Sequence, residues 1–164
     1  MAIPAWRGGV IAASFVVALM LTAMPLPTWG VAWRPAWVAM VLIYWAMALP
    51  DRVGMFTGFV LGLLVDVIEV NQSAVLGQHA LGLGIITYLV VSHHRRLRVF
   101  PLGQQAVVIG GLLLGYMALN GAILMAVGQP PNPWRLILPA LTSALLWPWL
   151  FIILRDLRRR ARLS

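Results

Sequence analysis

Apolar residues occupy six long runs along the chain, and short polar or proline-containing segments separate one run from the next. We expect each run to form a helix, with a chain order of six helices and no strands. The expected helices cover residues 9–26, 35–50, 53–70, 74–92, 104–127 and 136–154.

The segments between the runs indicate where the helices stop. Pro25, Pro27 and Gly30 follow the first run, and Pro50-Asp51-Arg52 separates the second run from the third. Proline cannot donate to a helical hydrogen-bond ladder, and it also restricts the residue before it. The remaining breaks are the polar segments 71–73, 93–98 and 128–133.

The composition indicates what surrounds these helices. The 164 residues are 62% hydrophobic and 10% charged, whereas soluble domains carry about a quarter charged residues. A membrane helix needs about 20 apolar residues, so six spans would use nearly the whole chain. We therefore predict an all-α membrane protein with one transmembrane domain over residues 1–164, a retained first span and a basic tail over 155–164.

The arginines predict the orientation of these spans. With the amino terminus inside and six alternating spans, Arg34 and Arg135 are the outer arginines and the other ten are cytoplasmic. This distribution follows the positive-inside rule and predicts that both termini are cytoplasmic.

The second and third runs are short. Residues 36–49 would extend over roughly 21 Å, against a hydrocarbon core of about 30 Å. A re-entrant hairpin is one alternative, but it would place Arg52 near the middle of the membrane. Two short spans with local thinning of the bilayer account for the sequence better.

The net charge of +8 comes from twelve arginines against four carboxylates. Because the arginines lie in loops and tails, we expect them to contact anionic lipids at the cytoplasmic face, and we expect no nucleic-acid partner. The chain has no cysteine, which excludes disulfides and thiolate metal sites. We expect no metal, no cofactor and no catalytic residues.

The third run carries a doubled G-x-x-x-G pattern, formed by Gly54, Gly58 and Gly62. Small residues at this spacing let another helix approach closely, so they are candidates for helix packing or partner binding. Asp66 continues the same spacing and Glu69 follows it. These carboxylates are either exposed to water at the membrane surface or directed into a polar pocket.

Polar residues on the neighbouring runs extend this possible pocket. His79 lies on the fourth run, and Asn120 lies four residues after Tyr116 on the fifth. We expect them to hydrogen-bond between helices, with Gly111 and Gly115 as another close-packing pair. The polar pocket candidates are Asp66, Glu69, His79 and Asn120.

The sixth run contains Trp147-Pro148-Trp149. Pro148 is expected to bend the helix, because it cannot donate a hydrogen bond to the preceding turn. The tryptophans fit an aromatic belt at the membrane interface or a surface for a partner.

Several strings resemble the MreD family of rod shape-determining membrane proteins. The segments 33–37 (Trp-Arg-Pro-Ala-Trp) and 42–50 (Leu-Ile-Tyr-Trp-Ala-Met-Ala-Leu-Pro) resemble the family's early part. The glycine-and-aspartate segment 57–66 and the segment 146–149 (Leu-Trp-Pro-Trp) resemble its later helices. The resemblance makes Arg34, Trp37 and Tyr44 further candidates for packing or partner binding, beside Trp147, Pro148 and Trp149.

The resemblance implies a non-catalytic scaffold of the cell-elongation complex in the bacterial inner membrane. Its implied partners are MreC by direct contact, and MreB, the RodA glycosyltransferase and the transpeptidase that works with RodA through the complex. The implied fold is similar to the substrate-binding component of energy-coupling-factor transporters. That likeness leaves open an alternative role as a small-molecule or lipid-binding component of a transporter, and the carboxylates leave open an intramembrane enzyme.

Overall fold

A computed structural model describes residues 5–25, 27, 30, 33–68, 76–128 and 132–161. Within these ranges the chain forms seven helices and no strand, which confirms the all-helical prediction. The helices are α1 (Ala5–Ala23), α3 (Trp37–Ala48), α4 (Met55–Ile68), α5 (Gln78–Ser92), α6 (His94–Val99), α7 (Leu102–Ala126) and α8 (Pro133–Arg160).

Two helices differ from their expected limits. α6 occupies the basic segment that was read as a loop, and Pro101 separates it from α7. α8 begins at Pro133 because Asn132 caps it: the Oδ1 of Asn132 accepts a 3.1 Å hydrogen bond from the backbone N–H of Trp134. At its other end α8 continues to Arg160, so most of the expected tail is helical.

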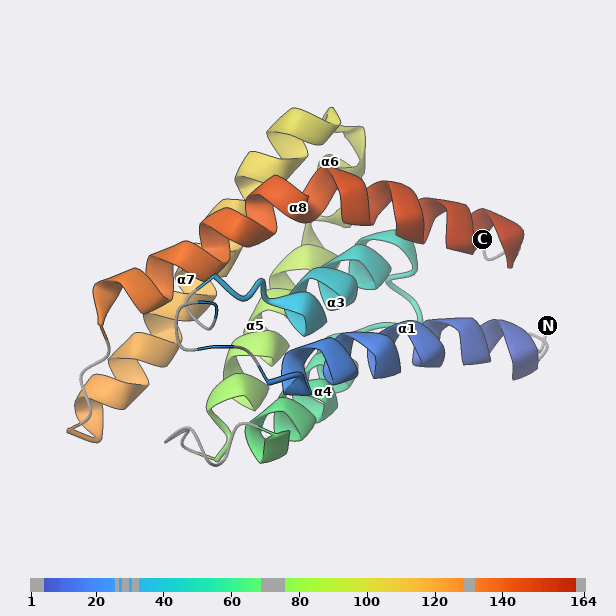
Figure 1. The fold of residues 1–164 in the computed structure, drawn as a ribbon. Coiled ribbons are helices and arrows are strands. Elements are labelled where there is room, and N and C mark those ends of the chain that lie inside the picture. Colours follow the sequence, from blue (N-terminus) through green and yellow to red (C-terminus); the bar gives the residue numbers. More distant parts are fainter. Residues whose placement is uncertain are drawn as a thin grey trace.

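Helix length and composition support a membrane location. α7 and the part of α8 from Leu136 to Arg160 are each 25 residues long and contain an 18-residue stretch with mean hydropathy 2.0, so both are long and apolar enough to cross a bilayer. α3, α4, α5 and most of α1 are shorter apolar helices. Figure 1 shows the start of α1 and the end of α8 on the same side of the bundle.

The centre of the bundle is α3. Every residue of this helix after Trp37 is buried, and α3 contacts α1, α5, α6 and α8. A helix that is apolar on all sides is stable only where it is covered on all sides, which explains why so short an apolar run persists as a helix. Two side-chain hydrogen bonds fix its position: Trp45 Nε1 donates to Ser14 Oγ on α1 at 2.8 Å, and the backbone N–H of Ala36 donates to Ser143 Oγ on α8 at 2.9 Å.

α4 and α5 form the closest helix pair, and glycine makes the approach possible. A Cβ atom added at Gly62 would overlap the backbone of Ala80, and one at Gly58 would overlap the Thr87 side chain. The glycine face of α4 is therefore covered by α5 within the chain. Gly54 lies outside this contact, because nothing lies within 4 Å of a Cβ added there.

α7 and α8 form a second close pair. Here a Cβ atom added at Gly110 would lie 3.0 Å from the Cβ of Ala144, whereas Cβ atoms added at Gly111 and Gly115 would meet nothing within 4 Å. The expected Gly111–Gly115 packing pair is therefore wrong, and the contact uses Gly110 on an adjacent face of α7. Figure 1 shows α8 changing direction near the middle of its length, and Pro148 lies in this part of its sequence.

Candidate functional site

Asp66 lies in the last turn of α4, where its carboxylate is 1% exposed. It accepts hydrogen bonds from the first backbone N–H groups of α5: Oδ2 from Gly77 at 2.8 Å and Ala80 at 3.4 Å, and Oδ1 from His79 at 2.9 Å. The first N–H groups of a helix have no partner within the helix and carry a partial positive charge. Asp66 therefore caps α5 from the neighbouring helix.

The side chain of His79 completes this cap. Its Nδ1 lies 2.8 Å from Oδ1 of Asp66, and its side chain is 12% exposed. The Asp66 carboxylate thus has four contacts with residues 77–80, three of them at 2.8–2.9 Å, which orient both the carboxylate and the imidazole. A carboxylate held by so many donors is suited to fixing two helices together.

Asn120 and Tyr116 approach α5 from α7. The ring of Tyr116 lies against Gly82, and its centroid is 6.1 Å from that of His79. Gln78 Nε2 donates to the backbone oxygen of Asn120 at 3.4 Å, and the buried Oδ1 of Asn120 has no hydrogen-bond partner. Three of the four polar pocket candidates therefore lie along the start of α5, and Glu69 lies outside the described residues.

Arg34 approaches the same region from the segment before α3. Its guanidinium donates to the backbone oxygens of Thr22 at 2.8 Å and Met24 at 2.6 Å, at the end of α1. A cation there is favourable, because the last carbonyls of a helix carry a partial negative charge. The Nε of Arg34 is buried without a hydrogen-bond partner.

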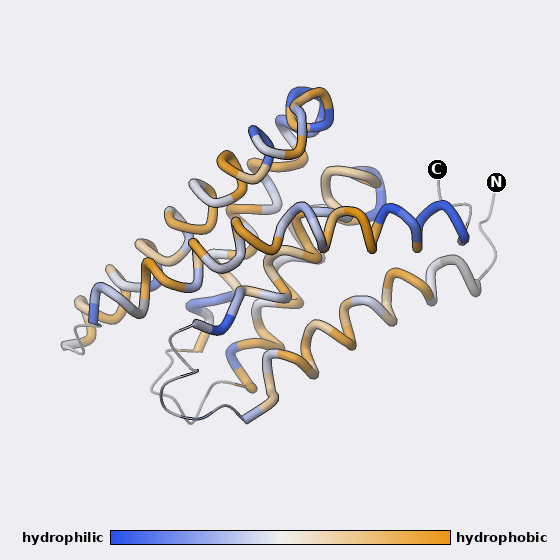
Figure 2. Tube along the Cα trace, turned by 45° about the horizontal axis from the view of Figure 1, so that its top comes forward, coloured by the Kyte–Doolittle hydropathy of each residue, from blue (hydrophilic) through white to orange (hydrophobic). Residues whose placement is uncertain are grey.

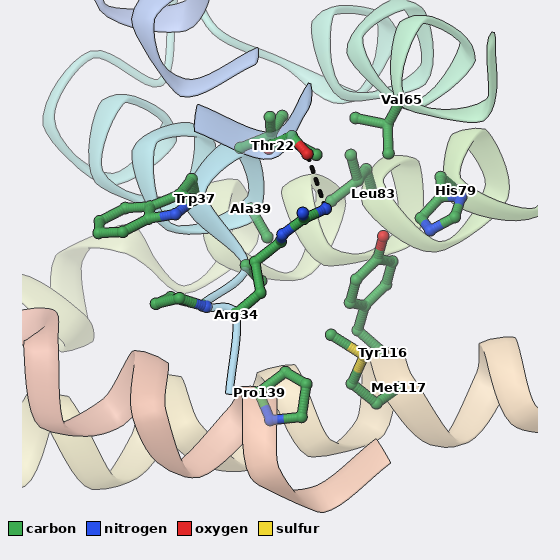
Figure 3. A pocket seen from close by; sticks show the side chains of 13 residues that line it. Thr22, Arg34, Trp37, Ala39, Val65, His79, Leu83, Tyr116, Met117 and Pro139 are labelled. Carbon is green, nitrogen blue, oxygen red and sulfur yellow. Dashed lines mark hydrogen bonds between the residues drawn. The ribbon is translucent and has the colours of Figure 1, made fainter. Parts of the chain in front are cut away.

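Arg34, His79 and Tyr116 line a cavity of about 190 Å³. Figure 3 shows these side chains reaching toward it from three different parts of the chain, with Trp37 and Pro139 at its edge. The cavity joins one guanidinium and one imidazole with apolar walls such as Val65 and Leu83. Such a lining can hold a small polar molecule or waters.

The remaining candidates lie in two other places. Trp147 is fully buried, and its Nε1 donates to Oε1 of Gln105 at 3.0 Å, so it is a core residue rather than part of an interfacial belt. Trp149 is 59% exposed. Tyr44 is 1% exposed and packs edge-on against Phe151, with ring centroids 5.4 Å apart.

Sequence reasoning did not single out Gln105. Its side chain is 1% exposed, its Nε2 donates to the backbone oxygen of Leu97 at 2.9 Å, and its Oε1 accepts from Trp147. It thus joins α6, α7 and α8. The available signal is an isolated polar residue near the start of an apolar run, which does not indicate the helices it contacts.

An apolar groove separates α1 from α8. It has a volume of about 510 Å³, and α3 forms its floor through Trp37 and Val41. Figure 1 shows α1 and α8 on either side of α3. The walls of this groove are residues of α1 and α8: Val10, Ala13, Ser14, Val17, Ala18, Leu21, Trp149, Leu150, Ile153, Leu154 and Leu157.

Comparisons with known proteins bear on this arrangement. A family model described as rod shape-determining protein MreD matches residues 7–157. The rod shape-determining protein MreD of Haemophilus influenzae is 33% identical over 149 residues, which cover 91% of this chain and 90% of the relative. No solved structure matches the chain, so the expected likeness to a transporter component stays a prediction.

Proposed function

This chain belongs to the MreD family of rod shape-determining membrane proteins, and on that premise we propose that it is a non-catalytic scaffold of the cell-elongation complex. Membership itself implies a role in rod shape determination. The scaffold role is supported by a site that binds its own helices together: the Asp66 carboxylate is directed at the backbone of α5.

We place the chain in the inner membrane with six spans and both termini in the cytoplasm. The arginine distribution supports this orientation, as does the position of the start of α1 and the end of α8 on one side of the bundle. The last turns of α8, which are hydrophilic in Figure 2, then lie at the cytoplasmic surface beside anionic lipids.

The direct partner in this proposal is MreC, and its transmembrane helix packs into the groove between α1 and α8. The glycine face of α4 is not used, because Gly58 and Gly62 are covered by α5. The groove is apolar, it is open along two helices, and its floor is the central helix α3. In this proposal MreB, RodA and the transpeptidase that works with RodA interact with this chain indirectly, through the other members of the complex.

Filling the groove tests this placement. Val17 and Val16 are neighbours on α1 and are 55% and 52% exposed, but only Val17 lines the groove. Val17→Trp should reduce co-purification of MreC about tenfold or more, because the indole occupies the space of the partner helix. Val16→Trp, which adds the same bulk on another face of α1, should leave co-purification unchanged.

Cysteine crosslinking gives an independent readout. The chain has no cysteine, so a single introduced one is unique. Ile153→Cys in the groove should crosslink to a cysteine in the MreC membrane helix, whereas Leu145→Cys, at an 82% exposed position of α8 outside the groove, should not. Equal crosslinking at both positions, or equal loss of MreC with both tryptophan variants, contradicts the placement.

A second candidate function is binding of a small polar molecule in the cavity of Arg34, His79 and Tyr116. The buried Nε of Arg34, which has no hydrogen-bond partner, favours it. Native mass spectrometry of the purified protein should then show a bound small molecule that Tyr116→Phe or Arg34→Gln releases. A mass equal to that of the bare chain, with lipids only, dismisses this function.

A further inference from the structure

A second pocket lies at the opposite end of α3 from Arg34, where α3, α6, α7 and α8 meet. Its volume is about 140 Å³, close to the roughly 150 Å³ that accommodates a benzene-sized molecule. Its lining combines the apolar side chains of Met47, Ala48 and Phe151 with polar ones from the four helices. The polar lining residues are Tyr44, Arg98, Gln105 and Arg158.

The hydroxyl of Tyr44 is the first sign that this pocket has a ligand. Tyr44 is 1% exposed, yet its hydroxyl has no hydrogen-bond partner. A buried hydroxyl without a partner is costly, and native proteins rarely retain one. Edge-on contacts with Trp45 and Phe151, at centroid distances of 5.3 and 5.4 Å, fix the direction of the ring.

Every available polar group of the pocket is a donor. Gln105 is already engaged, because its Oε1 accepts from Trp147 and its Nε2 donates to Leu97. That leaves the Tyr44 hydroxyl and the guanidinium groups of Arg98 and Arg158. Such a set of donors matches an oxyanion with several acceptor oxygens.

The arginines here also lack carboxylate partners. Within the described ranges the only ion pair joins His79 to Asp66, at the other end of the bundle, so none involves an arginine. Arg98 and Arg158 line the pocket, and the Nε of Arg155 is buried without a partner. The nearby Asp156 is exposed on α8. The local positive charge is therefore not neutralised by the protein.

We propose that this pocket binds the phosphate of an anionic phospholipid, with Arg98 and Arg158 pairing with the phosphate and the Tyr44 hydroxyl donating to it. A lipid rather than a soluble anion is favoured because the pocket is half apolar and lies beside the hydrophilic end of α8. Basic pockets between helices at the cytoplasmic face of membrane proteins bind headgroups in this way. The proposal does not depend on how the groove or MreC is used.

The test titrates phosphatidylglycerol into the purified full-length protein in neutral detergent and follows the bound fraction by native mass spectrometry. Arg98→Gln and Arg158→Gln should each weaken phosphatidylglycerol binding about fivefold, since each removes one basic contact. Tyr44→Phe removes only the hydroxyl and should weaken it about fivefold as well. Matched controls are Arg96→Gln on α6 and Arg160→Gln on α8, which lie outside the pocket and should leave binding within twofold.

Inorganic phosphate serves as the second probe and separates the two sources of the anion. Failure of phosphate to compete, with weakened lipid binding in the pocket variants, supports the lipid site. Phosphate that displaces phosphatidylglycerol from the wild type, but not from Arg158→Gln, supports an anion site and assigns it to a soluble ligand instead. Equal effects of the pocket and control variants on phosphatidylglycerol binding overturn the proposal. Unchanged phosphatidylglycerol binding in all three pocket variants (Tyr44→Phe, Arg98→Gln and Arg158→Gln) also overturns it.

Discussion

Asp66 and His79 are thirteen residues apart in the chain, and Oδ1 of the aspartate contacts both the backbone N–H and the ring Nδ1 of the histidine, at 2.9 and 2.8 Å. One oxygen thus orients the start of α5 and the side chain of His79 together. The contact joins α4 to α5 at the end where the glycine-mediated packing of the pair finishes. It makes this pair a rigid unit within the bundle.

Replacing the carboxylate tests the capping role. Asp66→Asn should lower the free energy of unfolding by about 2–4 kcal/mol, because an amide accepts with one oxygen and leaves backbone donors of α5 without a partner. Unfolding by sodium dodecyl sulfate in mixed micelles measures the change. Asp156→Asn, at an exposed position on α8, is the matched control and should change stability by less than about 0.5 kcal/mol. Equal stability of the two variants contradicts the capping role.

Glycine substitutions test the close helix approach. Gly62→Ala should destabilise the protein by at least about 2 kcal/mol, because the new Cβ atom overlaps the backbone of Ala80, which cannot move independently. Gly115→Ala, on α7, has open space around its Cβ position and should be neutral or stabilise the helix by about 0.5–1 kcal/mol. The same micelle unfolding assay compares them. A destabilised Gly115→Ala, or a Gly62→Ala without effect, would show that α4 and α5 are not packed in this way.

The two neighbouring tryptophans should separate stability from partner binding. Trp147→Phe should cost about 1–3 kcal/mol, since it leaves Oε1 of the buried Gln105 without its donor, whereas Trp149→Phe should hardly change stability. A double-mutant cycle of Trp147→Phe with Gln105→Leu should give a coupling energy of about 1 kcal/mol. A coupling energy of zero would mean that the hydrogen bond contributes nothing. Trp149 lines the groove, so Trp149→Phe should instead reduce the co-purification of MreC.

Single cysteines test the orientation in the membrane. In intact spheroplasts a membrane-impermeant maleimide should label cysteines placed at Trp33 and Gly128. Cysteines at Asp51 and Arg96 should be labelled only after the membrane is permeabilised. All four positions are exposed in the structure, and the chain has no cysteine of its own. Labelling of the Asp51 cysteine from outside would exclude two separate spans for α3 and α4.

The presence of most helices could be predicted from the sequence, because apolar runs and the prolines between them are local features of the chain. Pro50, Pro101 and Pro133 lie at the ends of α3, α7 and α8, although the expected starts of the last two helices, residues 104 and 136, were two and three residues too late. The glycine spacing on α4 likewise indicated a close helix contact. The partner helix could not be identified from the spacing, because nothing in it distinguishes α5 from another chain.

The polar contacts were harder to predict, since they depend on which helix ends meet. Asp66 looked like one residue on a glycine face, but its partners are backbone groups whose position depends on the path of the chain between α4 and α5. Gln105 and Trp147 are 42 residues apart, and neither stands in a motif that implies the other. α6 was missed because its basic run carries no apolar periodicity, although Leu97 is buried.

The burial of α3 has a consequence for how the protein is made. This helix leaves the ribosome well before α8, which covers one of its faces. The face that carries Tyr44 and contacts Phe151 is therefore not fully covered until α8 has been made. A chain that ends before α8 would leave this surface of α3 uncovered, so the burial of the central helix depends on the helix farthest from it in the sequence.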